Sequence, residues 1–231
     1  MFEAASVLSK FDLTTTVLAI GSLGTAAYGF VDVTKGYRGG ISNAGFGDIK
    51  RVISAFIPPR TGATGTVGLG QASALETLKA NWLNGMTLGD QKAVAKALVK
   101  LNLGEASAGQ MAAAAGVNAE LLLSIAKKLS SGEPLDSQET DAYGRFDLML
   151  TALLDQAYQR ADQRYRNSAK LLAVPVSVIL AVVSARAIGI TGPYLWRAVI
   201  AGLLATPLAP VAKDVASAIQ AGAKVAQAIK K

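Results

Sequence analysis

The stretch KLLAVPVSVILAVVSARAIGITGPYLWRAVIAGLLATPLAPVAK, from Lys170 to Lys213, decides the fold of this protein. It contains two runs without a charged residue, 171–185 and 198–212, which are separated by a turn that includes Gly192-Pro193. Each run would form about 22 Å of α-helix, whereas the hydrocarbon core of a bilayer is roughly 30 Å thick. The residues next to the two runs therefore decide whether these helices can cross a membrane.

Those neighbouring residues are two arginines, Arg186 and Arg197. Arginine can carry its guanidinium to the membrane interface while its stem stays among apolar groups, so each helix gains the extra length that a span needs. Tyr194 and Trp196 then lie at the level of the lipid headgroups, where amphipathic rings are enriched. The alternative is a buried hairpin in a soluble core, but two helices that are apolar on all sides would need a larger protein around them. The stretch therefore predicts a transmembrane hairpin, with Arg186 and Arg197 at its outer interface or in a pore.

Another apolar run, LTTTVLAIGSLGTAAYGFV at residues 13–31, lies between Asp12 and Asp32. A cleaved secretory signal would carry a net positive charge before its apolar run. Here Glu3 and Asp12 offset Lys10, so we expect a retained membrane anchor.

Small residues recur at every fourth position of this first span, at Gly21, Thr25 and Gly29. Such spacing lets two membrane helices approach closely, although Gly, Ala and Thr are also common throughout membrane helices. The pattern predicts that Gly21, Thr25 and Gly29 form a helix-packing face in a homo-oligomer.

The basic residues are distributed unevenly around the three spans. They cluster in 35–51, in 160–170 and in 213–231, whereas the opposite connections carry only Lys10, Arg186 and Arg197. Because Lys and Arg are enriched in cytoplasmic loops, we expect the N-terminus outside and the C-terminus in the cytoplasm.

The predicted fold class is an all-α integral membrane protein with a helical cytoplasmic domain between its first and second spans. The expected segments are 1–35 (anchor and first transmembrane helix), 36–70 (Gly-rich linker with a short interfacial helix), 71–168 (helical cytoplasmic domain), 169–213 (transmembrane hairpin) and 214–231 (basic amphipathic tail).

The linker contains one amphipathic piece, Gly47–Phe56, whose apolar residues share a helical face. We expect this piece to lie along the membrane surface, with Lys50 and Arg51 toward lipid headgroups. The glycines of 62–70 are not followed by Lys-Ser/Thr, so they fail the pattern of a phosphate-binding loop and indicate a flexible connection.

Helical periodicity dominates the following segment. Residues 74–84 and 90–101 are amphipathic, and Thr87 is a suitable N-cap for the second of these helices. Asp136 and Glu139 have the spacing of a capping box at the start of a long helix. We expect that helix to run without a break into the second span.

Residues 109–132 are open to two interpretations. Their small and apolar residues have a spacing similar to that of DNA-binding helix-turn-helix motifs, which would place Lys127 and Lys128 on the recognition surface. The second helix, however, begins Asn118-Ala-Glu, which offers little to hydrogen-bond to bases and puts an acid where a phosphate would lie. A packed αα-hairpin explains the same residues.

The organisation of the chain resembles a family of uncharacterised bacterial inner-membrane proteins. The resemblance rests on the N-terminal anchor, the C-terminal hairpin with its basic tail, and a helix rich in Tyr and Arg that begins with Phe146-Asp147 and continues through Tyr158, Arg160, Tyr165 and Arg166. It covers the two ends of the chain and departs from the family pattern in the middle third. The resemblance implies this topology and a location in the bacterial inner (plasma) membrane.

Composition limits the possible chemistry. The chain has no cysteine and no histidine, which excludes thiolate and imidazole metal sites, cysteine nucleophiles and histidine bases. We find no paired carboxylates near the spans and no Ser-Lys or Gly-x-Ser-x-Gly context. We therefore expect no catalytic residue, no metal and no cofactor, and predict a protein that is not an enzyme.

The remaining hypotheses are non-enzymatic. The tail residues Val215, Ile219, Ala223, Ala226 and Ile229 form an apolar stripe that suits a partner helix or a membrane surface. With the net charge of +7, this favours a homo-oligomeric scaffold with membrane lipids as partners and no small-molecule substrate. The alternatives are an oligomeric channel, in which a ring of Arg186 or Arg197 would favour anions, and a membrane-tethered DNA-binding protein, although we do not expect nucleic acid as a partner.

Overall fold

The computed structural model describes residues 13–37, 39–59 and 70–229, and every regular element among them is a helix. The chain divides into two compact units. The three-helix unit consists of the residues up to Ile41 together with those from Arg166 onward, and the six-helix unit runs from Ser42 to Tyr165. The prediction of an all-α protein is confirmed for the described residues.

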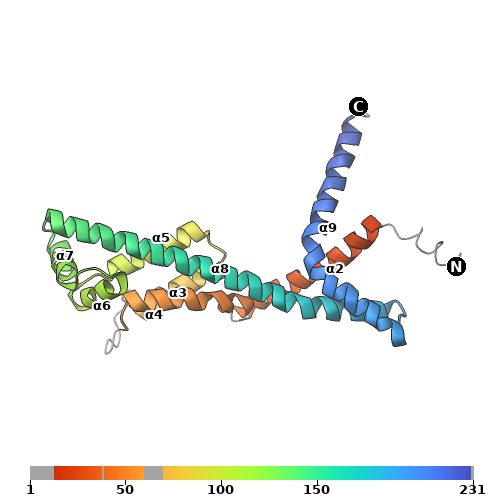
Figure 1. Ribbon diagram of the computed structural model, residues 1–231, viewed down its shortest axis with the longest axis horizontal. Coiled ribbons are helices and arrows are strands. Elements are labelled where there is room, and N and C mark those ends of the chain that lie inside the picture. Colours follow the sequence, from red (N-terminus) through yellow and green to blue (C-terminus); the bar gives the residue numbers. More distant parts are fainter. Residues whose placement is uncertain (1–12, 38, 60–69, 230–231) are drawn as a thin grey trace. The chain divides into compact units, whose positions relative to one another are not determined.

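The three-helix unit contains the helices that are long and apolar enough to cross a membrane, three in the described part of the chain. They are α2 (Leu13–Val33), the part of α8 (Ser137–Ala187) that follows Tyr165, and α9 (Leu195–Ile229). The short 3-10 helix η3 (Gly192–Tyr194) joins α8 to α9, and two more, η1 (Thr34–Gly36) and η2 (Gly40–Ser42), follow α2 (Figure 1). Three apolar helices are what the sequence predicts.

Helix α9 is longer than predicted. The sequence predicts a span that ends near Ala212 and a separate tail from 214, whereas one continuous helix extends to Ile229. It includes Pro207 and Pro210, and it changes direction partway along its length (Figure 1). Proline lacks an N–H donor and its ring clashes with the preceding turn, which is the usual cause of a bend. The described part of the tail is therefore a continuation of α9.

Helices α2 and α9 approach each other at glycines. A Cβ atom added to Gly21 would lie 2.1 Å from the Cβ of Ala212, and one added to Gly24 would lie 2.1 Å from the carbonyl oxygen of Ala205. No larger side chain fits at either position without moving the helices apart. Close backbone approach through small residues is typical of helix packing in membranes.

Helices α8 and α9 have a similar contact, centred on Gly202. A Cβ atom at this glycine would lie 2.5 Å from the Cα of Val178. The hydroxyl of Ser177 donates to the carbonyl oxygen of Gly202 at 2.7 Å and lies 3.3 Å from the hydroxyl of Thr206. Ser177 and Thr206 are both buried, so these polar groups join two helices in the interior of the unit.

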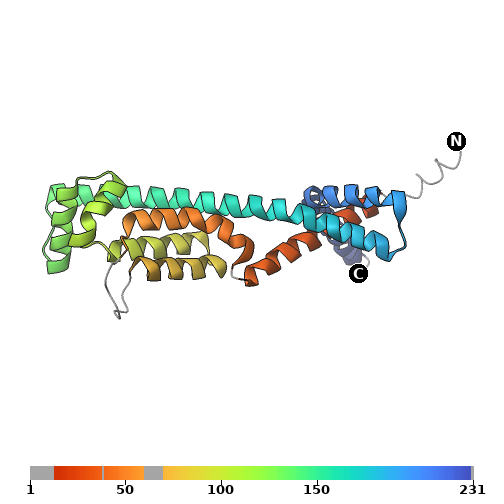
Figure 2. The same cartoon turned by 90° about the horizontal axis from the view of Figure 1, so that it is seen from below.

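The six-helix unit is built around large apolar side chains. Its helices are α3 (Asn43–Phe56), α4 (Gln71–Leu83), α5 (Leu88–Leu101), α6 (Glu105–Ala115), α7 (Ala119–Ser131) and the first part of α8, drawn from a second direction in Figure 2. The rings of Phe56 and Phe146 meet edge to face at 6.2 Å between centroids. Fully buried around them are Ile49, Ile53, Leu78, Met111, Leu122, Ile125, Leu150 and Leu154.

Local sequence signals define several helix ends. The Thr87 hydroxyl accepts from the backbone N–H of Asp90 at 3.2 Å, which confirms the predicted N-cap of α5. The backbone N–H groups of Asp136 and Glu139 donate to each other's carboxylates at 2.9 and 2.8 Å, so the predicted capping box forms. Gly116 ends α6 with a φ of 65°, a left-handed conformation that glycine adopts without steric cost. Helices α6 and α7 pack on each other around this turn.

The position of α3 differs from our expectation of a helix lying in a linker along the membrane surface. Its apolar residues Ile49, Ile53 and Phe56 are fully buried in the core of the six-helix unit. A Cβ atom at Gly45 would lie 2.3 Å from the carbonyl oxygen of Ala161 in α8, so the two helices are in tight contact. The amphipathic pattern identifies a buried face but not what buries it, and here other helices of the same unit do so rather than lipid.

Candidate functional site

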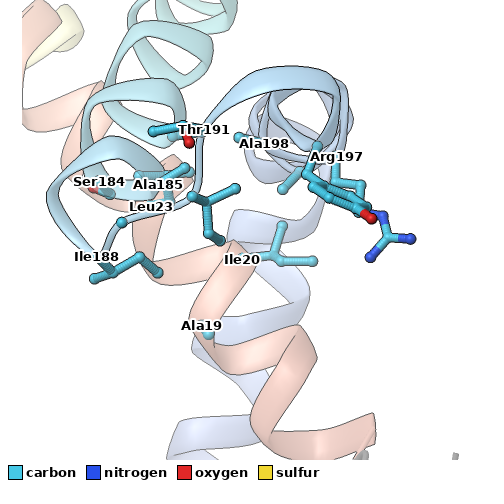
Figure 3. Close-up of a pocket in the computed structure, with 14 residues that line it drawn as sticks. Ala19, Ile20, Leu23, Ser184, Ala185, Ile188, Thr191, Arg197 and Ala198 are labelled. Atoms are coloured by element: carbon cyan, nitrogen blue, oxygen red, sulfur yellow. The ribbon is translucent and has the colours of Figure 1, made fainter. Parts of the chain in front are cut away.

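An open cavity of about 910 Å³ lies within the three-helix unit (Figure 3). Its volume falls in the range of roughly 300–1,000 Å³ that is typical of ligand sites. Side chains from α2, from the end of α8, from the turn and from the start of α9 line it. Most of these are alanine, leucine and isoleucine, so the cavity has the apolar character of a site for a hydrophobic group.

The turn between α8 and α9 creates this space. The backbone N–H of Ile190 donates to the carbonyl oxygen of Ala185 at 2.9 Å, and Gly189 next to it has a φ of 84°, so α8 ends in a tight left-handed turn. Gly192, with a φ of 64°, reverses the chain before α9 begins. Ala185 and Ala198, which both line the cavity, carry only methyl groups and so leave room between the helix ends.

One side of the cavity carries a charge. Arg197 is the only charged residue among the described residues that line it. Its guanidinium carbon lies 5.3 Å from the ring centroid of Tyr194 and 5.7 Å from that of Trp196, at the distances of cation–π contacts. Ser184 and Ile188 lie on the opposite side of the space, while Ile20 and Leu23 project into it from α2 (Figure 3). The cavity thus combines an apolar interior with one cation held by two aromatic rings.

The structure brings only part of the predicted site residues to this region. Arg197 lines the cavity, whereas Arg186 is exposed and is not part of the lining. Lys50 and Arg51 are exposed on α3 in the six-helix unit, where Arg51 lies 3.5 Å from Asp48. Their contact with lipid headgroups stays a prediction.

Only one of the three residues in the predicted packing face of α2 is buried against another helix of the chain. Gly21 is buried against α9, but Thr25 and Gly29 are exposed, and nothing lies within 4 Å of a Cβ atom added to Gly29. The Thr25 hydroxyl donates to the carbonyl oxygen of Gly21 in its own helix at 3.1 Å. The contact with α9 uses Gly24 instead, which sequence reasoning missed. The signal for Gly24 is visible in retrospect as the small residues Gly21, Gly24 and Ala27 on one helical face.

Charged groups in the six-helix unit join helices to one another. Asp147 of α8 lies 2.6 Å from the amine of Lys96 and 2.5 Å from that of Lys100, and Asp155 lies 2.6 Å from the amine of Lys92. Burial raises the pKa of the Asp147 carboxyl, but hydrogen bonds from Lys100 and Lys96 and their charges outweigh it, so the net pKa is lowered. The hydrogen bond to Asp147 raises the pKa of Lys100. These pairs hold α5 against α8.

Glu139 is the most strongly perturbed carboxylate of this unit. Its oxygens accept from the amine of Lys128 and the hydroxyl of Ser124, both at 2.7 Å. Hydrogen bonds from Lys128, from Ser124 and from the Asp136 backbone lower the pKa of Glu139 to about 2. In the described part of the chain, no group of three or more acidic residues is placed to hold a metal ion.

Comparisons with known proteins add no assignment: no family model, no curated protein and no solved structure matches the chain. The proposals that follow therefore rest on the geometry and chemistry of the chain itself.

Proposed function

We propose that the protein is a non-enzymatic scaffold of the bacterial inner membrane that assembles as a homo-oligomer and carries the six-helix unit on the cytoplasmic side. The observation that carries this proposal is the exposure of large apolar side chains along the apolar part of α8. Leu171, Ile179 and Val183 are 75%, 61% and 59% exposed, respectively. Extended apolar surfaces of this kind are rare on soluble monomers and are covered naturally by lipid.

The exposed face of α2 supports self-association. With Gly21 and Gly24 used against α9, the small residues Ser22, Thr25 and Gly29 remain exposed on another face. A helix from a second copy could approach there as closely as α9 approaches on its own face. The homo-oligomer therefore rests on Thr25 and Gly29, and Gly21 serves the fold of the single chain.

The charged residues support a structural role rather than catalysis. Asp48, Glu139 and Asp147 are each held by a basic side chain of the same unit, and their ion pairs join helix to helix. Glu139 also caps α8 through the Asp136 backbone. Groups engaged in this way stabilise the unit, and the cavity that suits a ligand contains none of them.

Two observations count against the alternative functions. Ser177 and Thr206, which a polar path through the membrane could use, are buried against each other between α8 and α9. Lys128, half of the basic pair on a DNA-reading surface, is bound to Glu139. The scaffold needs neither an open polar path nor a free basic helix.

The topology can be tested with single cysteines, because the natural chain has none. Cysteines at Ser6 and Ser217 would be treated with an impermeant reagent in intact cells. Labelling at Ser6 alone is expected from the distribution of Lys and Arg. Labelling at Ser217 alone, or at both positions, would contradict the proposed orientation.

The assembly can be tested by the mass of the particle in lipid nanodiscs. The wild type should contain several copies, and Gly29→Leu should shift the particle toward one copy because leucine blocks close approach. Phe30→Leu, a change at an exposed neighbouring residue, is the matched control and should leave the mass unchanged. A wild-type particle of one copy would refute the homo-oligomer.

A further inference from the structure

We propose that the cavity at the α8–α9 turn binds an anionic phospholipid, with an acyl chain in the apolar space and the phosphate paired with Arg197. This inference rests on the proposed membrane location and goes beyond the scaffold function, because it assigns a specific ligand to a site.

The position of the cavity between the apolar helices favours a lipid as its ligand. Its lining comes from all three apolar helices: Ile20 and Leu23 from α2, Ala181 and Ala185 from α8, and Ala201 from α9. Each of these residues belongs to a helix that is long and apolar enough to cross a membrane. In the proposed membrane location, a cavity between such helices lies next to lipid molecules.

The chemistry of the lining favours a hydrocarbon chain inside the cavity. The residues that enclose the space present methyl and methylene groups, and they match the surface of a hydrocarbon chain rather than that of a polar metabolite. Ile188 is 76% exposed beside the cavity, so the apolar surface continues outward from it. An acyl chain would cover both the interior and this outer surface.

The single cation of the cavity suits the phosphate of a lipid headgroup. Arginine binds phosphate through paired hydrogen bonds from its planar guanidinium, a geometry that lysine does not reproduce. The rings of Tyr194 and Trp196 hold the Arg197 guanidinium at the side of the cavity. The same two rings are of the type that accumulates at headgroup level. A lipid with its phosphate at Arg197 would therefore place its chain in the apolar space.

The test uses the full-length protein in a mild detergent with native mass spectrometry. Phosphatidylglycerol and phosphatidylcholine would be titrated separately, and the stoichiometry and affinity of bound lipid would be recorded. We expect one tightly bound phosphatidylglycerol per chain, and weaker binding of phosphatidylcholine because its headgroup carries no net charge. Equal affinity for the two lipids would show that Arg197 does not select the headgroup and would overturn the proposal.

Two variants separate the headgroup from the chain. Arg197→Gln should weaken phosphatidylglycerol binding about tenfold, which corresponds to the loss of a charge-assisted contact. Arg186→Gln is the matched control, since Arg186 is an exposed arginine of the same turn region that does not line the cavity. An equal loss in both variants would indicate general surface attraction and would refute the site. Ala198→Leu should fill the apolar space and weaken the binding of both lipids.

Further readouts exclude other occupants. Inorganic phosphate should compete only at concentrations far above those of the lipid, and competition at equal concentrations would show that the acyl chain contributes nothing. If Ala198→Leu changed the number of protein copies but not the bound lipid, a second copy would be the occupant and the proposal would be wrong.

Circular dichroism would confirm that each variant folds. The copy number from the same spectra tests the scaffold separately, so a monomer that retains its selective lipid would refute only the homo-oligomer.

Discussion

The two units of this protein are both helical, but their interiors are built from different residues. In the six-helix unit, the fully buried side chains include Phe56, Phe146 and Tyr158. In the three-helix unit the buried residues are mostly alanines, together with the hydroxyl residues Ser177 and Thr206, while large side chains such as Leu171, Ile179 and Leu203 are exposed. The largest fully buried side chains in the described residues all belong to the six-helix unit.

The proposed membrane location of the three-helix unit explains this contrast. In water, burial of large apolar side chains drives folding, so these side chains gather in a core. In lipid there is no such gain, and helices associate through close backbone contact and hydrogen bonds between helices. The three-helix unit has the second kind of interior, and this supports its proposed location independently of hydropathy.

The largest expected effect is in the core of the six-helix unit. Phe146→Ala should destabilise this unit by about 3–5 kcal/mol, because a fully buried ring is replaced by a cavity. Leu203→Ala in α9 removes a side chain that is 49% exposed, and it should change stability by less than about 0.5 kcal/mol. Denaturation of the full chain in detergent, followed by Trp82 fluorescence in a Trp196→Phe background, would measure the first variant. Trp196 fluorescence in a Trp82→Phe background would measure the second. Equal losses would remove the contrast between the two interiors.

The next effect concerns the close approach of α2 and α9. Gly24→Ala should destabilise the three-helix unit by about 1–3 kcal/mol, because the new methyl group would overlap the Ala205 carbonyl oxygen. Gly29→Ala, measured in a detergent that keeps the protein as a single copy, is the matched control: within one chain its methyl group meets nothing within 4 Å, and alanine should favour the helix by roughly 0.5–1 kcal/mol. Thermal unfolding in detergent, followed by Trp196 fluorescence, would compare the stabilities of the two variants. Similar behaviour of both variants would contradict the packing of α2 on α9.

A smaller effect is expected for the hydroxyl contact between α8 and α9. Ser177→Ala should cost about 0.6 kcal/mol, and at most about 1.7 kcal/mol, which is the range for hydrogen bonds between membrane helices. Ser217→Ala should cost less, because the Ser217 hydroxyl is exposed and donates to the Lys213 carbonyl of its own helix. A double-mutant cycle with Thr206→Val would isolate the coupling. Additive losses would show that the two hydroxyls do not interact.

The last effect is identified by its pH dependence and concerns Glu139. Its pKa is lowered from 4.5 to about 2 in the folded protein. Ionised Glu139 therefore contributes fully to the stability of the six-helix unit above the unfolded-state pKa near 4.5. This stabilisation is lost as the pH falls from that value toward about 2. Glu139→Gln should make the stability of the six-helix unit less dependent on pH across this range. Urea midpoints from Trp82 fluorescence at several pH values would show it, and an unchanged pH slope would contradict the assigned interactions.

Much of the secondary structure could be predicted because its causes are local. The N-cap at Thr87 and the capping box of Asp136 and Glu139 each join residues that are three positions apart, so their pattern is readable in the chain. The candidate site was predicted only in part. Arg197 was identified as an important cation, but Ile20, Leu23 and Ala198 carry no chemical signal of their own, and the cavity arises only where α2 meets the turn.

The sequence by itself determined the three apolar helices, the absence of cysteine and histidine chemistry, and the uneven distribution of basic residues. These depend on composition and on neighbours within a few positions. The tertiary structure decided which faces are covered. It placed the apolar face of α3 in a protein core, directed Gly24 toward α9, and left Thr25 and Gly29 exposed. The physical reason is that a glycine or an apolar stripe permits a close contact, while the partner that makes the contact is contributed by a backbone far away in the chain.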